Sequence, residues 1–190
     1  MNKILRINSK LSHSRANGPG LRAVVWFQGC SLGCPHCFNK GLNNSGEGAD
    51  IETDELFQWL VSLKGISGIT LSGGEPTEQI STLLPLLEKV KNETHLSILL
   101  FSGRFLGDIV TMSGGKMLVS LIDVLIDGPY DHHQANPPGI WPSSSNQKMH
   151  FLAGRYTMDD FTNLPCSEVI INDDGKVIKS GIFAYSEVVE

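Results

Sequence analysis

The feature that most constrains this chain is the stretch CSLGCPHCFN, residues 30–39, which holds three of its four cysteines. Cys30, Cys34 and Cys37 follow the spacing C-x3-C-x2-C. They lie too close together for useful cross-links, and four cysteines in a chain of this size do not make a disulfide framework. Thiolates at such spacing are instead typical ligands of a metal ion or an iron–sulfur cluster.

The number of cysteines bears on the kind of site. A structural zinc site is closed by four ligands, and a self-contained ferredoxin-type cubane also takes four cysteines. Three cysteines on a [4Fe-4S] cluster leave one iron without a protein ligand, and an open position can bind and activate another molecule. Zinc would need His36 or Cys166 as the fourth ligand. His36 lies between two proposed ligands, so sharing their metal would strain the loop, and a lone cysteine such as Cys166 is more often a small buried hydrophobe.

Length and composition indicate one globular domain. The chain has 190 residues, 41% hydrophobic and 18% charged, which is enough for a core without cross-links. The formal net charge of −5 argues against nucleic-acid binding. No apolar run is long enough to span a membrane, and the N-terminus MNKILRINSK lacks the core of a signal peptide. We therefore expect a soluble cytoplasmic protein.

Alternating strand and helix patterns predict an α/β fold. Apolar runs of strand length cover 23–28, 69–71, 96–101 and 119–126, and amphipathic helical patterns cover 53–63 and 80–90. Thr53 is expected to cap the first of these helices. Strands separated by helices form a parallel sheet, so their ends, each followed by a polar or glycine-rich turn, should share the face where ligands bind.

The second half of the chain adds two further features. Residues 129–148 are rich in Pro and Ser, and a loop of this length in a compact domain is usually functional or disordered. Residues 169–178 predict a β-hairpin around the Asp-Gly turn at 173–175. We expect residues 1–155 to form the main sheet and residues 156–190 to form a C-terminal β extension of the same domain.

Beyond the cysteines, several segments resemble the radical S-adenosylmethionine (SAM) superfamily. Residues 72–76 (SGGEP) resemble its Gly-Gly-Glu motif, which receives the SAM amino group, and 18–22 (GPGLR) resemble a segment of the activating enzymes of glycyl radical enzymes. Residues 123–128 (DVLIDG) and 144–148 (SSNQK) resemble segments of the activating enzyme of anaerobic, class III ribonucleotide reductase. The resemblance thus covers Gly18 to Lys148.

The chain departs from the family pattern at two positions. Asn17 precedes Gly-Pro-Gly where the family commonly has Asp, and His36 stands where a carbocyclic aromatic residue is common. An imidazole ring can still stack on adenine. Arg22, at the end of the Gly-Pro-Gly segment, could hold an anionic group or brace the loop.

The resemblance implies that the three cysteines hold a [4Fe-4S] cluster and that SAM chelates the fourth iron through its amino and carboxylate groups. Gly73 and Gly74 lack side chains, so the SAM amino acid moiety could approach their backbone closely. Glu75 could offer its carboxylate to the SAM ammonium group. The alternative for Glu75 is an acid stabilised by the dipole at a helix N-terminus.

Other residues are weaker candidates for the cofactor site. His36 and Phe38 flank the third cysteine and could line the adenine pocket, and Ser102 could meet the ribose or carboxylate. Asn146 and Gln147 could contact SAM or the partner's backbone. The alternatives are core packing for Phe38, a turn role for Ser102 and solvated loop positions for the last two. No catalytic side chain is expected beyond the cluster ligands.

The resemblance also implies a fold and a reaction. The fold is a partial (β/α) barrel of about six mainly parallel strands, with a small C-terminal β-hairpin addition. The reaction is reductive cleavage of SAM to a 5′-deoxyadenosyl radical, which takes a hydrogen atom from a glycine of a partner enzyme. Anaerobic ribonucleotide reductase is the expected partner, and flavodoxin or ferredoxin the expected type of electron donor. The alternatives are another glycyl radical enzyme, a peptide or a small molecule as substrate, or a non-catalytic metal-binding recruitment module.

Overall fold

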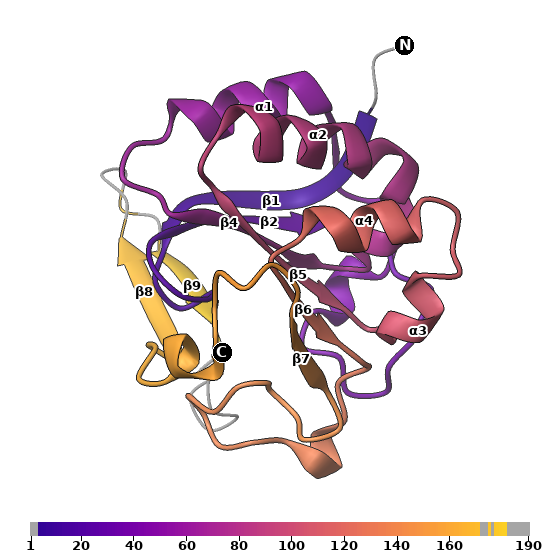
Figure 1. The fold of residues 1–190 in the computed structure, drawn as a ribbon. Helices are drawn as coiled ribbons and strands as arrows, with labels where there is room; N and C mark the ends of the chain where they lie inside the picture. The colour runs from indigo at the N-terminus through magenta and orange to yellow at the C-terminus, as the bar shows by residue number, and fades with distance from the viewer. Residues whose placement is uncertain (1–3, 172–174, 176, 182–190) are drawn as a thin grey trace.

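A computed structural model describes residues 4–171, 175 and 177–181 of the chain (Figure 1). The main sheet contains β1 (Ile4–Ser14), β2 (Arg22–Phe27), β3 (Ala49–Glu52), β4 (Gly68–Gly73), β5 (Ser97–Ser102), β6 (Val124–Asp127) and β7 (Lys148–Phe151). Strands β8 (Ser167–Ile171) and β9 (Val177–Gly181) form a separate hairpin. The helices are α1 (Thr53–Ser62), α2 (Ile80–Glu93), α3 (Leu106–Ile109) and α4 (Gly115–Leu121). Short 3-10 turns cover Lys40–Leu42, Pro76–Gln79, His132–Gln134 and Met158–Phe161.

The seven strands of the main sheet lie in the order β3-β1-β2-β4-β5-β6-β7. Strands β2, β4, β5 and β6 pair in parallel, as the βαβ pattern predicted. Strands β1, β3 and β7 were not predicted, and they extend the parallel centre with antiparallel pairs on both sides. The fold is therefore mixed α/β, with one more strand than the six expected.

The prediction of a strand over residues 119–126 is wrong in its first half. Helix α4 continues to Leu121, and strand β6 begins only at Val124. A short apolar run suits a buried helix end as well as a strand, so periodicity alone cannot separate them. Thr53 is likewise not the cap of α1, because Glu52 occupies that position and no side-chain cap hydrogen bond is formed.

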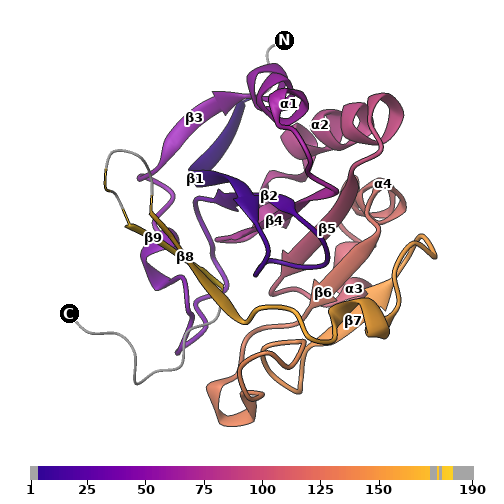
Figure 2. The same ribbon diagram turned by 90° about the vertical axis from the view of Figure 1, so that its left-hand side faces the viewer.

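The helices cover one face of the sheet, and the curved sheet turns its other face toward the hairpin (Figure 2). Alternating residues of each central strand face the two sides. Ile98 and Leu100 of β5 belong to the core under the helices, whereas Leu99 belongs to a smaller core with Val124 and Phe161. The chain after β7 therefore fills part of the concave side of the sheet.

Arg22 is fully buried on this concave side, and it braces the structure. Its guanidinium donates to the Thr70 hydroxyl at 2.8 Å, the Ser97 hydroxyl at 2.9 Å and the carbonyl oxygens of Pro19 and Ile69 at 3.2 and 2.7 Å. Burial lowers the pKa of the guanidinium. Of the two interpretations from the sequence, the bracing role is the one that these contacts support.

The predicted C-terminal hairpin is confirmed, with Ile171 paired to Val177 and Ser167 to Gly181. Of its predicted turn, residues 173 and 174 lie outside the described part of the chain.

The 129–148 segment is mostly loop, as its composition indicated, but its last residue begins β7. In the described ranges, none of the helices is both long and apolar enough to cross a bilayer.

Candidate active site

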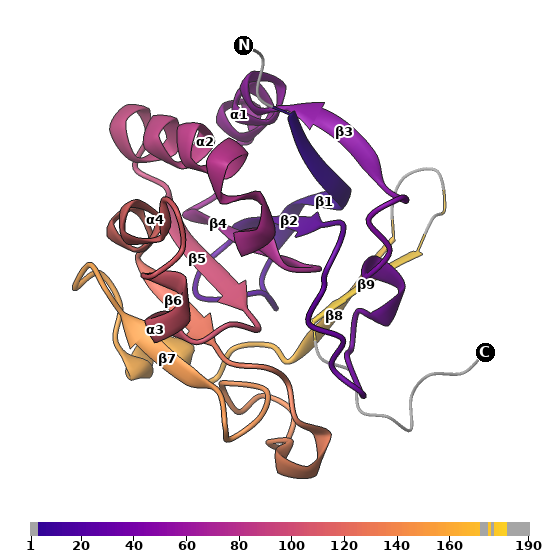
Figure 3. The same ribbon diagram turned by 90° about the vertical axis from the view of Figure 1, so that its right-hand side faces the viewer.

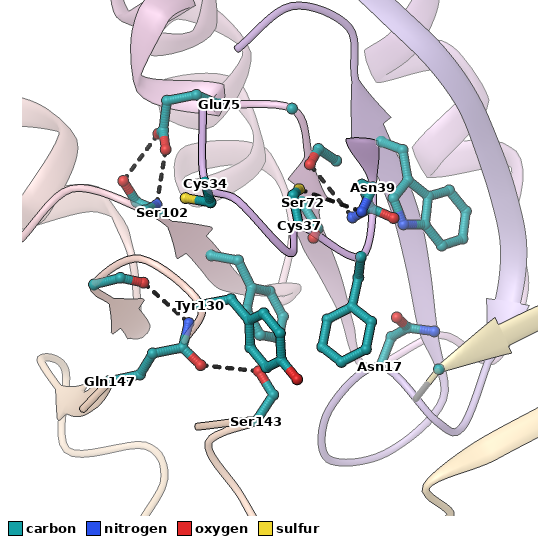
Figure 4. Close-up of a pocket in the computed structure, with 18 of the residues that line it drawn as sticks. Asn17, Cys34, Cys37, Asn39, Ser72, Glu75, Ser102, Tyr130, Ser143 and Gln147 are labelled. Atoms are coloured by element: carbon teal, nitrogen blue, oxygen red, sulfur yellow. Dashed lines mark hydrogen bonds between the residues drawn. The ribbon is translucent and has the colours of Figure 1, made fainter. Parts of the chain in front are cut away.

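The carboxyl ends of the four parallel strands meet around one cavity of about 210 Å³ (Figure 4). The cysteine loop follows β2, and Gly73, Gly74 and Glu75 end and follow β4. Ser102 ends β5, and Gly128 follows β6. Ligands of open α/β sheets bind at this edge. The sequence prediction that these turns lie together is confirmed.

All three motif cysteines line this cavity as half-buried free thiols. The Cys37 amide donates to the Cys34 carbonyl at 3.3 Å, and the Asn39 amide donates to the Cys37 sulfur at 3.3 Å. The Asn39 side chain also donates to the Gly73 carbonyl at 3.4 Å, which ties the loop to the end of β4. Burial is the main factor that raises the pKa of the Cys30 and Cys34 thiols, and metal binding would displace their protons.

A zinc site receives no support from the side-chain positions. Within the described residues, no three His, Cys, Asp or Glu side chains converge as ligands of one metal ion. His36 is exposed and lies tilted against the ring of His132, with 3.6 Å between ring centroids. Cys166 lines the cavity and is only half-buried, so the interpretation as a small core residue is wrong.

Gly73 and Gly74 are needed for the close approach of two backbone segments. A Cβ on Gly73, whose φ is 106°, would lie 2.4 Å from the Phe27 nitrogen. A Cβ on Gly74 would lie 2.2 Å from the Gly29 carbonyl oxygen. The Gly74 amide donates to the Phe27 carbonyl at 2.8 Å, and the Glu75 amide donates to the Gly29 carbonyl at 2.8 Å. The glycines thus hold the start of the cysteine loop against the end of β4.

Glu75 is 1% exposed, and its carboxylate joins the ends of β4 and β5 at the cavity (Figure 4). One carboxylate oxygen accepts from the Thr77 amide at 3.0 Å, the Thr77 hydroxyl at 2.6 Å and the Ser102 hydroxyl at 2.9 Å. The other accepts from the Gly103 amide at 2.8 Å. This confirms the helix N-terminal interpretation, because Glu75 is the N-cap of the Pro76–Gln79 turn. None of the ion pairs in the described ranges includes Glu75, so its negative charge faces no cationic side chain at pairing distance.

The weaker candidates divide into two groups. Phe38 and Ser102 line the cavity, whereas His36 and Asn146 do not. Phe38 is 48% exposed and lies 4.2 Å from the Tyr130 ring, so the core-packing alternative is wrong. The Ser102 hydroxyl also accepts from the Arg104 amide at 3.0 Å, which supports its turn role.

The two polar residues at the end of the long loop have different surroundings. The Asn146 side chain donates to the Pro129 carbonyl at 2.7 Å and so holds the two ends of the loop together. Gln147 lines the cavity, where it donates to the Gly128 carbonyl at 3.0 Å and accepts from the Ser143 hydroxyl at 2.8 Å. Both side chains are partly buried and bonded within the loop, so neither is simply solvated.

The structure adds cavity residues that the sequence interpretation did not assign. Trp26, Tyr130 and Trp141 line the cavity with aromatic rings. Trp26 is the one residue of β2 that is not fully buried, but the run around it is apolar throughout, so no alternation in the sequence marked it. Nothing in the sequence indicated that Cys166, far along the chain, would share the cavity with the motif cysteines.

A family model described as a 4Fe-4S single cluster domain matches residues 16–150. The chain belongs to this family. The matched region contains every cysteine of the C-x3-C-x2-C motif and all four parallel strands, and it ends before the hairpin.

Among similar proteins are anaerobic ribonucleoside-triphosphate reductase-activating proteins. The one from Haemophilus influenzae is 32% identical over 141 residues, which are 70% of this chain and 90% of that protein. The one from Pasteurella multocida is 30% identical over 69% of this chain and 87% of its own length. A pyruvate formate-lyase-activating enzyme from Clostridium pasteurianum is 37% identical over 46% of this chain and 39% of its length. These relatives confirm the resemblance to radical SAM activating enzymes.

A solved structure of QueE from Escherichia coli superimposes on 53% of this chain and 52% of its own chain, with a TM-score of 0.46 and 16% identity.

The residues of the 4Fe-4S single cluster domain fit both expected cofactors. Three half-buried thiols that line one cavity have the chemistry and the number to hold three irons of a [4Fe-4S] cluster. A buried carboxylate without a cationic partner among the described residues favours a positively charged ligand such as SAM. The exposed ring of Phe38 against Tyr130 offers an apolar surface for a purine.

Proposed function

We propose that this protein is a radical SAM activase that forms a glycyl radical on anaerobic ribonucleoside-triphosphate reductase. The observation that carries the proposal is the cavity at the ends of four parallel strands, which brings together the three motif thiols and the buried charge of Glu75. Relatives that match most of their own length are named as activators of this reductase.

The protein's own residues bind, orient and shield the cofactors. When bound and reduced, the cluster and SAM supply a 5′-deoxyadenosyl radical that abstracts a hydrogen atom. The three motif thiols would hold three irons of the cluster and leave the fourth for SAM, and Glu75 holds Ser102 and Gly103 in place beside the cavity. The aromatic residues around the cavity reduce access of water to the radical.

Three finer assignments are part of the same proposal. The curved sheet with helices on its outer face is the partial (β/α) barrel of the superfamily, with residues 156–190 as an extension of the core formed by 1–155. The electron donor is a low-potential protein such as flavodoxin or ferredoxin. Of the candidate residues, Phe38, Gly73, Gly74, Glu75 and Ser102 contact SAM, and His36 and Asn146 support the loops around it.

A second candidate keeps the chemistry and changes the partner. The pyruvate formate-lyase-activating relative, at 37% identity, matches a shorter region of this chain. Another glycyl radical enzyme is therefore the alternative substrate, and assays with both partner enzymes distinguish the two.

The test begins with anaerobic reconstitution with iron and sulfide, followed by dithionite reduction in the presence of SAM. We expect about four irons per chain, as one cubane requires, and formation of 5′-deoxyadenosine. Added reductase should then acquire a glycyl radical that is detectable by electron paramagnetic resonance. Cys34→Ala should lose both cluster and product, whereas the matched variant Cys166→Ala should retain them. Bound zinc, or a cluster that never cleaves SAM, would leave a metal-binding recruitment module.

A further inference from the structure

The hairpin β8–β9 is anchored through one of its two faces. Glu168 and Ser180 lie opposite each other in the hairpin register and share this inner face. Glu168 accepts hydrogen bonds from the Ser14 hydroxyl and, at 3.0 Å, from the Arg15 amide. The Ser180 hydroxyl accepts from the Asn17 side chain at 2.6 Å. The inner face is thus fixed to the connection between β1 and β2.

The outer face of the hairpin carries three exposed apolar side chains, with the exposed Lys179 beside them opposite Val169. Val169, Ile171 and Val177 are 56, 70 and 57% exposed. Ile171 and Val177 are directly paired, and Val169 is two residues before Ile171, so the three side chains lie on one face. Apolar side chains grouped in this way, unlike single exposed ones, mark a surface that binds another molecule.

The base of the hairpin is part of the wall of the cavity. Cys166, directly before β8, and Gly181, at the end of β9, both line it. At about 3.3 Å per residue, Val169 lies roughly 10 Å and Ile171 roughly 17 Å along the strand from Cys166. Figure 3 shows the hairpin on the side of the main sheet away from helices α1 and α2. A macromolecule that inserts one residue into the cavity would therefore also cover the hairpin, whereas a small molecule inside the cavity would not reach it.

The rim of the cavity offers apolar surface on its other sides too. Phe38 and Ile140 line the cavity and are still 48 and 54% exposed.

The hairpin lies outside the core that this chain shares with its relatives. The family match ends at residue 150. The reductase-activating relatives match about 70% of this chain and about 90% of their own length. A segment outside the shared core is better suited to selecting the partner protein than to changing the reaction in the cavity.

We propose that the outer face of β8–β9 is a docking surface for the glycyl radical enzyme, which places an apolar patch there while its glycine enters the cavity. This inference rests on the proposed function. The partner is a folded protein with exposed apolar side chains near its glycine loop. Docking at this face sets the affinity for the partner and leaves SAM cleavage unchanged.

The test compares two double variants with the wild type. Val169→Thr with Ile171→Thr removes apolar surface from the hairpin and keeps β-branched residues in the strand. Val61→Thr with Met117→Gln is the matched control, because these residues are similarly exposed, at 45 and 50%, on helices α1 and α4. For each reconstituted protein, we would measure 5′-deoxyadenosine without partner, and the KM for anaerobic ribonucleotide reductase from the rate of glycyl radical formation.

We expect the hairpin variant to raise the KM for the reductase by about tenfold or more, as loss of central apolar contacts does at interfaces. Its 5′-deoxyadenosine yield without partner should equal that of the wild type, and the helix variant should match the wild type in both assays. A hairpin variant with an unchanged KM, or with a KM raised no more than that of the helix variant, would overturn the docking proposal. Loss of partner-free SAM cleavage in the hairpin variant would also overturn it. Wild-type protein that cleaves SAM but forms no glycyl radical would instead refute the proposed function, and the docking inference with it.

Discussion

Replacing Glu75 by glutamine would remove the charge from the carboxylate that joins the ends of β4 and β5. Both carboxylate oxygens act only as acceptors, from Thr77 and Ser102 on one side and from the Gly103 amide on the other. A glutamine amide can present an oxygen to one side only. Its NH2 group would then face an N–H or O–H donor, and at least one of the four hydrogen bonds would be lost.

The expected loss of stability follows from these bonds. A hydrogen bond to a charged group contributes about 1.5–3 kcal/mol net, and one between neutral groups about 0.5–1.5 kcal/mol. Loss of the Gly103 bond, taken at the upper end of the charged range, therefore costs about 3 kcal/mol in the free energy of unfolding, before any weakening of the other three bonds. At roughly 2–4 °C per kcal/mol for a chain of this size, the Tm should fall by about 6–12 °C.

The assay is thermal unfolding of the cluster-free protein under anaerobic conditions, with Glu55→Gln in the exposed first turn of α1 as the control. Equilibrium dialysis of the reconstituted variant should also show weaker binding of SAM, because the buried charge that favours a cation is gone. A Tm within about 1 °C of the wild type would refute the reasoning, since it would mean that the carboxylate does not hold these strand ends together.

Three further predictions test other parts of the site. Gly74→Ala would place a methyl group 2.2 Å from the Gly29 carbonyl oxygen, so the loop must shift, and iron content after reconstitution should fall. Arg22→Met would leave several buried carbonyl and hydroxyl groups without their donor, and denaturant unfolding should report a loss of about 3 kcal/mol or more. Burial raises the pKa of Cys30 and Cys34 in the folded apoprotein, so the unfolded chain ionises first as the pH rises. The Tm of the apoprotein should therefore fall as the pH rises above about 8.5. The Tm of the cluster-loaded protein should not show this fall, because its thiolates are already bound to iron.

The parts of the fold that the sequence predicted are those with a strong local signal. The four parallel strands carry continuous apolar runs because both faces of each strand are buried, and helices α1 and α2 carry regular apolar stripes. Strand β1 was missed because its burial alternates irregularly and three of its central residues are exposed. The end of α4 was misassigned because a few apolar residues fit either a helix or a strand.

The sequence by itself determined the chemistry of this protein. Three cysteines in one short loop and a Gly-Gly-Glu segment after the next strand restrict the cofactors, because ligand type and number follow from residue identity alone. Only the tertiary structure decided which residues from distant parts of the chain line the cavity around these ligands. Gly73 and Gly74, which suggested space for a ligand, also make room for the protein's own backbone, and Cys166 reaches the cavity from beyond the family match. Contacts between segments far apart in the chain depend on how the sheet curves and how the loops pack, which no local pattern encodes.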